Sequence, residues 1–188
     1  SEQVDIVSEM GEASIIGYQT KELGSVNHSV VACAKHFIAD GATIWGTGMG
    51  NNPDKIDRGN APISDSLIRA KYLPPYQKAL DAGVGTVMAS FNSINDLKCH
   101  ANGYLFNDLL KDELGFDGFV VSDWQGIDEI PGDYKSDIIN SVNAGIDMIM
   151  VPGKAHVKDA GEHYKTFLKL FKEAVDEGLI SEKRLNDA

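Results

Sequence analysis

The sequence lacks any long hydrophobic run and contains only two cysteines. No apolar stretch approaches the roughly 20 residues that a membrane-spanning helix requires, so we expect no membrane anchor. Cys33 and Cys99 cannot build a disulfide framework, and they match no zinc-binding spacing. Cys33 lies in an apolar run and is predicted to be a small core residue. These absences leave the composition of one globular domain, with 43% hydrophobic residues.

Basic residues are also scarce, with 17 Lys and Arg against 28 Asp and Glu and a net charge of -11. A surface of this sign repels a phosphate backbone, so we expect no nucleic acid as a partner. The one basic cluster, Lys165, Lys169 and Lys172, alternates with Glu162 and Glu173. That alternation is typical of a solvated helix face rather than a binding surface.

Four short apolar runs recur along the chain, at residues 29–34, 85–91, 118–123 and 147–151. Each run is nearly continuous in apolar residues, which is typical of parallel strands buried on both faces. Longer segments of helical periodicity lie before, between and after them: residues 4–18, 64–82, 104–114, 135–144 and 160–177. Repeating strand–helix units of this kind predict a parallel α/β fold with right-handed crossovers.

The helix ends carry recognisable signals. Ser64 is a candidate N-cap, Pro74 and its neighbour predict a break near Leu73, and Ser181 is expected to cap a final turn. In the last long helix a stripe of apolar side chains is predicted to face the core: Tyr164, Phe167, Leu168, Phe171 and Val175.

Two folds satisfy this order of elements, a doubly wound sheet and a (β/α)8 barrel. The four predicted strands amount to half of an eight-stranded barrel, which typically needs about 250 residues. Composition alone does not choose between the two folds.

The segment from Ile38 to Pro62 is long, polar and rich in glycine, and it leaves the end of the first strand. A loop of this length in a compact domain is usually functional or disordered, and the end of a strand is where parallel α/β folds place their sites. Its glycine series, Gly46 to Gly50, lacks the GK[ST] ending of a phosphate-binding loop, and no helix follows directly. We therefore exclude a nucleotide site there.

Polar residues gather where the predicted strands end. Lys35 and His36 close the first strand, and Asp40 follows a few residues on. Ser90 and Asn92 close the second strand, followed by His100. The third strand is closed by Ser122, Asp123 and Trp124. Parallel strands bring such ends to one rim. A carboxylate, two nitrogen donors and an indole at one rim suit a sugar site, because carboxylates cleave glycosidic bonds and indoles stack on pyranoses.

Plainer structural roles are open to the same residues. Asp123 could cap the turn after its strand, Lys35 could pair with a carboxylate, and His36 could be a hydrogen-bonded core histidine. Trp124 and Trp45 could be packing residues. Three acids in the loop after the third strand are expected to be solvated: Asp128, Glu129 and Asp133.

Four motifs resemble glycoside hydrolase family 3. Residues 34–43 (AKHFIADGAT) resemble its KHFxGDGGT segment, and residues 87–93 (VMASFNS) its VM-S-[YF]-NS strand. Residues 116–124 (FDGFVVSDW) resemble the strand that ends in SDW and carries the nucleophile. Residues 144–152 (AGIDMIMVP) resemble the AG-DM-MVP segment. The four motifs are in the family's order, and the resemblance extends from about Val4 to Ala188.

This resemblance implies a retaining β-glycosidase whose nucleophile is Asp123, without metal or cofactor. It implies that Lys35 and His36 hold hydroxyls of the sugar in the −1 subsite and that Trp124 lines the aglycone side. We expect the substrate-binding set to be Lys35, His36, Trp124, Asp40 and Ser90. Substrates would be β-linked glucosides or glucans, cleaved from their non-reducing ends to release glucose.

The branch of the family is indicated by two short elements. The sequence Asp57-Arg58-Gly59-Asn60 is similar to a D-[QR]-G-[DN] element of bacterial exo-glucanases and β-glucosidases. The N-acetylglucosaminidase branch has a KHFPGHG pattern with a loop histidine, where this sequence has Ala39 and Asp40. The resemblance therefore favours the glucosidase branch, and it suggests a periplasmic or secreted location.

The resemblance also implies that residues 1–188 cover only about the second half of the family's barrel. The early strands would precede Ser1, and the acid/base glutamate would lie in an α/β sandwich domain after Ala188. A retaining mechanism needs two carboxyl groups, so we expect this chain alone to have little or no hydrolase activity. Its open sheet edges are expected to pair with the missing half or with another copy.

Two other functions stay open at this point. Lys35 could form a Schiff base in an aldolase, since lysines at barrel strand ends do that work. The chain could instead be a noncatalytic or split-chain sugar-binding subunit that completes its site with a partner.

Overall fold

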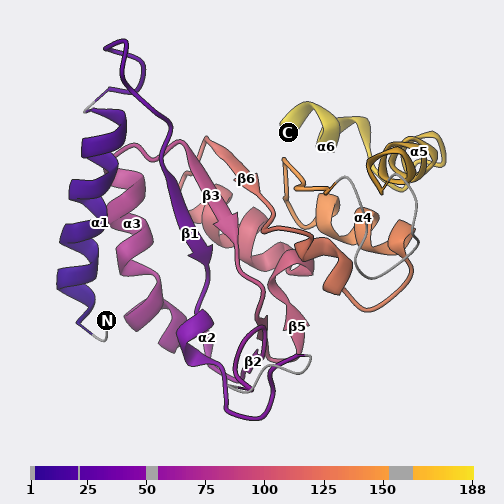
Figure 1. The fold of residues 1–188 in the computed structure, drawn as a ribbon, viewed down its shortest axis with the longest axis horizontal. Coiled ribbons are helices and arrows are strands. Elements are labelled where there is room, and N and C mark those ends of the chain that lie inside the picture. The colour runs from indigo at the N-terminus through magenta and orange to yellow at the C-terminus, as the bar shows by residue number, and fades with distance from the viewer. Residues whose placement is uncertain (1–2, 21, 50–54, 153–162) are drawn as a thin grey trace.

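The computed structural model describes residues 3–20, 22–49, 55–152 and 163–188 (Figure 1). In chain order the elements are α1 (Val4–Gln19), β1 (Cys33–Phe37), the 3-10 turn η1 (Asp40–Ala42), β2 (Asn60–Ala61), α2 (Asp65–Leu67), the π-helical turn η2 (Ile68–Tyr72), α3 (Pro74–Asp81), β3 (Thr86–Ala89), β4 (Ser93–Ile94), β5 (Leu97–Lys98), the 3-10 turn η3 (Cys99–Ala101), the π-helix η4 (Tyr104–Glu113), β6 (Phe119–Val121), the 3-10 turn η5 (Gly126–Glu129), α4 (Tyr134–Asn143), α5 (His163–Asp176) and α6 (Glu182–Asp187). No helix in the described part of the chain is long and apolar enough to cross a membrane.

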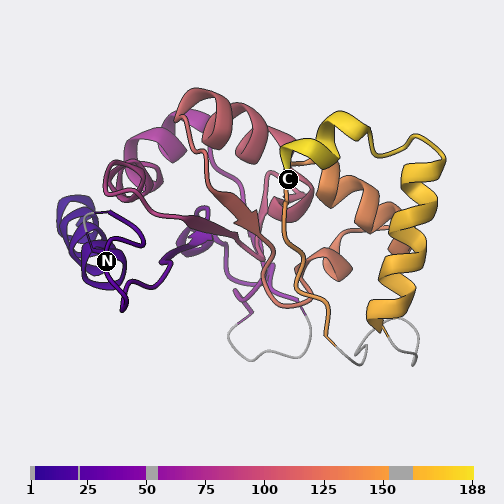
Figure 2. The same cartoon turned by 90° about the horizontal axis from the view of Figure 1, so that it is seen from above.

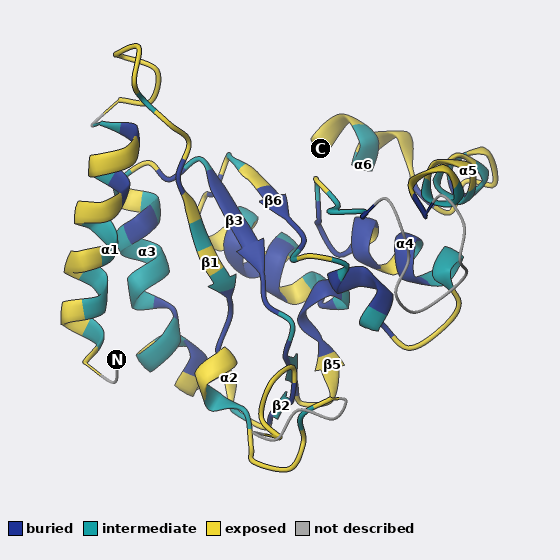
Figure 3. Ribbon diagram, in the orientation of Figure 1, coloured by how far each residue is buried: buried dark blue, intermediate teal, exposed yellow. Residues whose placement is uncertain are grey.

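The main sheet has the order β1-β3-β6, and both pairings are parallel. All four residues of the central strand β3 are buried, as the continuous apolar run predicted (Figure 3). Seen from above, α1, α3 and η4 form an arc along one side of these strands (Figure 2). The prediction of a parallel α/β fold is confirmed.

The predicted fourth strand is reduced to a single parallel bridge between Val121 and Met148. Side chains take over part of the ladder here. The Asp147 carboxylate accepts the Val120 N–H at 2.7 Å, and the Ser122 hydroxyl accepts the Met150 N–H at 2.8 Å. Within the described residues the sheet therefore has three strands where the sequence analysis predicted four, although residues 147–150 do run beside β6.

A second, small sheet forms within segments that were predicted to be loops. Its order is β2-β4-β5, with β2 parallel to β4 and β4 antiparallel to β5. The turn between β4 and β5 is made by Asn95 and Asp96, both at positive φ, which is the geometry of a tight hairpin. The Asn60 side-chain amide donates to Asp96 at 2.7 Å, so β2 is attached to that turn.

The predicted helix ends are largely confirmed. The Ser64 hydroxyl accepts the Leu67 N–H at the start of α2, and the Ser181 hydroxyl accepts the Arg184 N–H at the start of α6. The helix from Ser64 breaks at Leu73, between η2 and α3. The cause is the proline pair that follows, which provides no backbone N–H groups for a continuous α-helix.

The apolar stripe predicted for the last long helix is only partly buried. Phe167, Phe171 and Val175 pack against the core beneath α4 and α5, whereas Tyr164 is 45% and Leu168 58% exposed. Residues 160–162 lie outside the described residues. The lysine face of this helix is solvated as expected, with Lys169 and Lys172 each 75% exposed.

The core is divided between two clusters, one around the main sheet and one beneath α4 and α5. Cys99 is fully buried in the first. Cys33, predicted to be a core residue, is exposed instead. Its strand β1 is an edge strand of the main sheet, and its first residues have no partner strand on their outer side in the described part of the chain.

Candidate active site

The carboxyl ends of β1, β3 and β6 bring polar residues to one rim, as predicted from the motif positions. His36 on β1 and Asp123 just after β6 face each other, with 3.3 Å between His36 Nε2 and Asp123 Oδ2. The Asp123 side chain is 16% and the His36 side chain 38% exposed, so both are reachable from solvent. Two residues far apart in sequence therefore form the centre of the candidate site.

The Asp123 carboxylate is held by its own turn. Its Oδ1 accepts the Trp124 N–H at 2.6 Å, while Oδ2 faces His36. The Ser122 hydroxyl donates to the Asp123 carbonyl at 2.9 Å and accepts the Met150 N–H. One carboxylate oxygen of Asp123 therefore caps the turn, and the other is left to face His36, so the two roles considered for Asp123 do not exclude each other.

A buried histidine supports this turn from below. The Asp123 N–H donates to His100 Nε2 at 3.0 Å, and His100 is fully buried. Burial, together with the positive charge of Lys98, lowers the pKa of His100 to about 3. The imidazole is therefore neutral at ordinary pH. Sequence reasoning noticed His100 as a polar residue after the second strand, but gave it no role.

The other residues predicted to bind substrate have different surroundings. Lys35 and Asp40 are exposed beside His36, and Trp124 is 57% exposed, so its indole is available to a ligand. Ser90 is 1% exposed, and its N–H donates to the Phe37 carbonyl at 2.7 Å. Direct sugar binding by Ser90 stays a prediction.

Of the three loop acids predicted to be solvated, Asp128 and Glu129 are largely buried, whereas Asp133 is exposed as predicted. Glu129 is paired with Lys98 at 3.0 Å and with the Arg58 guanidinium, and its side chain is 13% exposed. Asp128 is buried beside His163, at 3.4 Å, and Asp133 caps α4 by accepting the Ser136 N–H. The ion-pair partners of Glu129 and Asp128 come from other segments, which no local sequence pattern indicates.

The Asp57–Asn60 element lies at the rim. The Arg58 guanidinium carbon lies over the Phe91 ring, 4.6 Å from its centroid, and the Arg58 carbonyl accepts the buried Lys98 ammonium at 3.3 Å. Among the described residues, no three His, Cys, Asp or Glu side chains are grouped to hold a metal ion.

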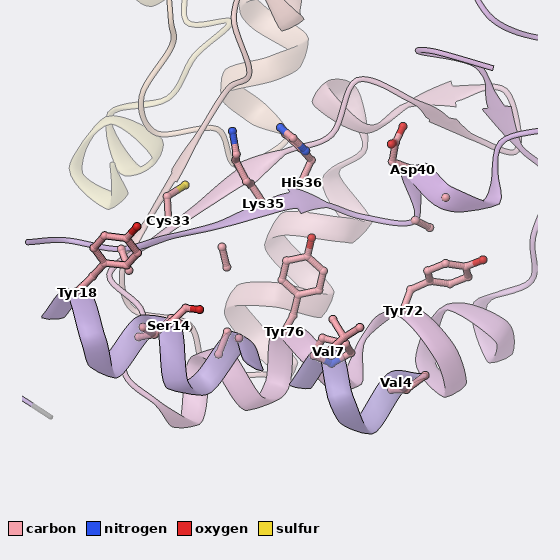
Figure 4. A pocket seen from close by; sticks show the side chains of 18 of the residues that line it. Val4, Val7, Ser14, Tyr18, Cys33, Lys35, His36, Asp40, Tyr72 and Tyr76 are labelled. Carbon is pink, nitrogen blue, oxygen red and sulfur yellow. The ribbon is translucent and has the colours of Figure 1, made fainter. Parts of the chain in front are cut away.

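A groove of about 710 Å³ lies beside the site, lined by residues of α1, β1 and α3. In Figure 4 the Tyr76 side chain rises from α3 toward β1, whereas Lys35 and His36 extend from β1 away from α1. The groove is lined mainly by apolar side chains such as Val7, Val31 and Ala79, and Asp123 is not among them. The lining also includes Lys35, His36 and Asp40, so the hollow adjoins the acid–imidazole pair without including Asp123.

Comparison with known proteins assigns the family. The description "Glycosyl hydrolase family 3 N terminal domain" matches residues 1–188. A β-xylosidase of Formosa agariphila is 39% identical over 79% of this chain and 20% of its own length. A probable β-glucosidase of Arthroderma benhamiae is 35% identical over 87% of this chain and 19% of its own length.

Solved structures agree with this assignment. An exo-1,3/1,4-β-glucanase from a Pseudoalteromonas species matches with a TM-score of 0.83 and 36% identity, over 100% of this chain and 21% of that one. A β-glucosidase from Listeria innocua in complex with glucose matches with a TM-score of 0.77 and 28% identity, over 96% of this chain and 23% of that one. The chain thus spans about a fifth of these relatives, and it belongs to glycosyl hydrolase family 3, in the N-terminal domain of that family.

Proposed function

We propose that the protein carrying this chain is a retaining β-glycosidase whose nucleophile is Asp123. The observation that carries the proposal is the position of the Asp123 carboxylate at the end of β6, partly exposed and 3.3 Å from His36. The strand end is where parallel α/β folds place catalytic groups. Family membership supports the same chemistry and leaves the aldolase hypothesis for Lys35 without support.

The proposed reaction has two steps. The Asp123 carboxylate attacks the anomeric carbon while the bond to the leaving oxygen breaks, and an acid group outside residues 1–188 protonates that oxygen. Water, deprotonated by the same group, then hydrolyses the glycosyl ester. His36 and Lys35 donate to sugar hydroxyls, Asp40 accepts from them, and the exposed Trp124 indole borders the leaving group.

The substrates we propose are β-linked glucosides or glucans, cleaved at the non-reducing end. The names of the structural relatives support this class, since one is an exo-1,3/1,4-β-glucanase and another a β-glucosidase solved with glucose and with laminaribiose. The relative named β-xylosidase makes an aryl β-xyloside the natural comparison substrate. The turnover rates of an aryl β-glucoside and an aryl β-xyloside, measured in parallel, decide between glucose and xylose as the preferred sugar.

The groove beside β1 supports the proposal that residues 1–188 are one part of a larger barrel. Its apolar lining and the outer edge of β1, which is unpaired within the described residues, suit a further strand of the same protein. The chain spans only 19–20% of its relatives, which is consistent with a site completed by other segments. We therefore assign no acid/base residue within these 188 residues.

The test is chemical rescue in the full-length protein. Asp123→Gly should abolish hydrolysis of an aryl β-glucoside, and added azide should restore cleavage and yield the α-glycosyl azide, since azide attacks from the face that the carboxylate vacates. Asp117→Gly, which removes an exposed acid just before β6, is the matched control and should keep normal activity. Hydrolysis by Asp123→Gly at the wild-type rate would refute the assignment.

A further inference from the structure

His100 is joined to the nucleophile through the backbone rather than through the site. Its Nε2 accepts the Asp123 N–H at 3.0 Å, and the ring is fully buried. An imidazole nitrogen that accepts a hydrogen bond carries no proton, so the neutral tautomer here has its proton on Nδ1. The ring is closed to solvent, and the mechanism proposed above does not use it.

The turn that follows Asp123 is shaped around this ring. A Cβ at Gly126 would collide with His100 Nε2 and its neighbouring ring carbons. The Gly126 N–H also donates to the Asp123 carbonyl at 3.0 Å, which closes the turn over the imidazole. The absence of a side chain at residue 126 therefore allows the ring to reach the Asp123 peptide.

An ion pair joins the two turns that make this contact. Lys98 directly precedes η3, which carries His100, and Glu129 ends η5, which begins at Gly126. Lys98 Nζ lies 3.0 Å from Glu129 Oε2, and only 7% of the Lys98 side chain and 13% of the Glu129 side chain are exposed. The pair therefore keeps η3 against η5 and, with them, His100 against Asp123.

The His100 ring also contacts Phe91, which in turn contacts Arg58. Phe91 packs on His100 with 5.8 Å between ring centroids, and the Arg58 guanidinium lies 4.6 Å from the centroid of the same Phe91 ring. His100 is thus fixed on one side by an aromatic ring and on the other by the turn. A group held this firmly positions whatever it binds, and it binds the nucleophile's own peptide.

We propose that His100 is a positioning residue, whose Nε2 fixes the Asp123 peptide so that the carboxylate meets the anomeric carbon in line. This rests on the function proposed for Asp123. Without the acceptor, the Asp123 N–H, which is only partly buried, loses this partner and the turn shifts to find another. A displacement of about 1 Å at a reacting group costs on the order of 100-fold in rate.

The test compares His100→Gln with His100→Leu in the full-length protein. Gln can present an acceptor oxygen near the position of Nε2, whereas Leu fills similar space without one. We expect His100→Leu to lower kcat by about 100-fold with a KM change below about 3-fold, and His100→Gln to stay within about 10-fold of wild type. Wild-type kcat in His100→Leu would overturn the proposal, and so would equal losses in the two variants with unchanged thermal unfolding.

A measurement on the wild-type protein covers the case in which His100→Leu does not fold. Nitrogen-15 NMR of histidine-labelled protein should report His100 as the neutral tautomer with unprotonated Nε2. A protonated Nε2 would overturn the proposal, because the ring could then not accept the Asp123 N–H.

The two proposals fail in different ways when a 2-fluoro-glucoside is used as an inactivator. Absence of a covalent adduct on Asp123 in the wild type would reject the proposed function and the His100 role together. An adduct on wild-type Asp123, formed at the same rate in His100→Leu, would reject the role of His100 alone.

Discussion

The two edges of the main sheet differ in how completely their contacts are satisfied. Beside β6, His100 accepts the Asp123 N–H, and Lys98 pairs with Glu129. Side chains of residues 122 and 147 bond to backbone N–H groups and so continue the hydrogen-bond ladder of the sheet. Beside β1, the strand edge is open within the described residues, Cys33 is exposed and an apolar groove of about 710 Å³ lies against α1. The β6 edge is therefore organised within this chain, whereas the β1 edge has the character of an interface.

The largest effect should come from separating this chain from the rest of its protein. We expect residues 1–188 alone to turn over an aryl β-glucoside at least about 1,000-fold more slowly than the full-length protein, since only one of the two required carboxyl groups is assigned here. The measurement is the hydrolysis rate of the aryl β-glucoside with equal molar amounts of the two proteins. Comparable rates would mean that the acid/base group lies within these residues.

The closed edge should depend on its buried ion pair. Glu129→Leu leaves Lys98 buried without its carboxylate, and we expect a loss of roughly 3 kcal/mol in the free energy of unfolding. Urea denaturation of the isolated chain is the measurement, and the double variant Lys98→Met, Glu129→Leu should recover most of the loss. A single variant as stable as the wild type would show that the pair does not hold the edge.

A charge introduced at the open β1 edge should destabilise the protein only when other segments of the full-length protein cover that edge. Val31→Asp in the groove should lower the Tm of the full-length protein by about 5 °C, because a covered carboxylate loses its hydration. In the isolated chain, where Val31 is 48% exposed, the change should be below about 0.5 kcal/mol. Leu168→Asp, at the exposed surface of α5, is the control. Equal effects in the two forms would contradict the interface.

The smallest change in stability should come from Trp124. Trp124→Ala removes an indole that is 57% exposed, so the free energy of unfolding should change by less than about 0.5 kcal/mol. Loss of stacking should instead raise KM for a disaccharide by about 10-fold, which corresponds to about 1.4 kcal/mol. Steady-state kinetics with laminaribiose measure this. A large stability loss with unchanged KM would make Trp124 a packing residue.

The sequence predicted well what local patterns encode. Continuous apolar runs indicated the parallel strands, Ser64 and Ser181 marked helix starts, and residues at the carboxyl ends of β1 and β6 were placed at one rim. These features follow from the periodicity and capping chemistry of neighbouring residues. They suffice to bring His36 to Asp123.

What the sequence did not predict depends on contacts between distant segments. Strands β2, β4 and β5 have two residues each, too short for any periodic pattern. The Glu129 side chain is only 13% exposed because Lys98 and Arg58 reach it from other loops. The fourth strand is shortened because side chains of Asp147 and Ser122 replace backbone partners. None of these contacts leaves a local signal in sequence.

The most direct measurement is peptide mass mapping after inactivation of the full-length protein with a 2-fluoro-glucoside. The account predicts one added fluoroglucosyl mass on the peptide that contains Asp123, located to that residue by fragmentation. An adduct on any other carboxylate would contradict it.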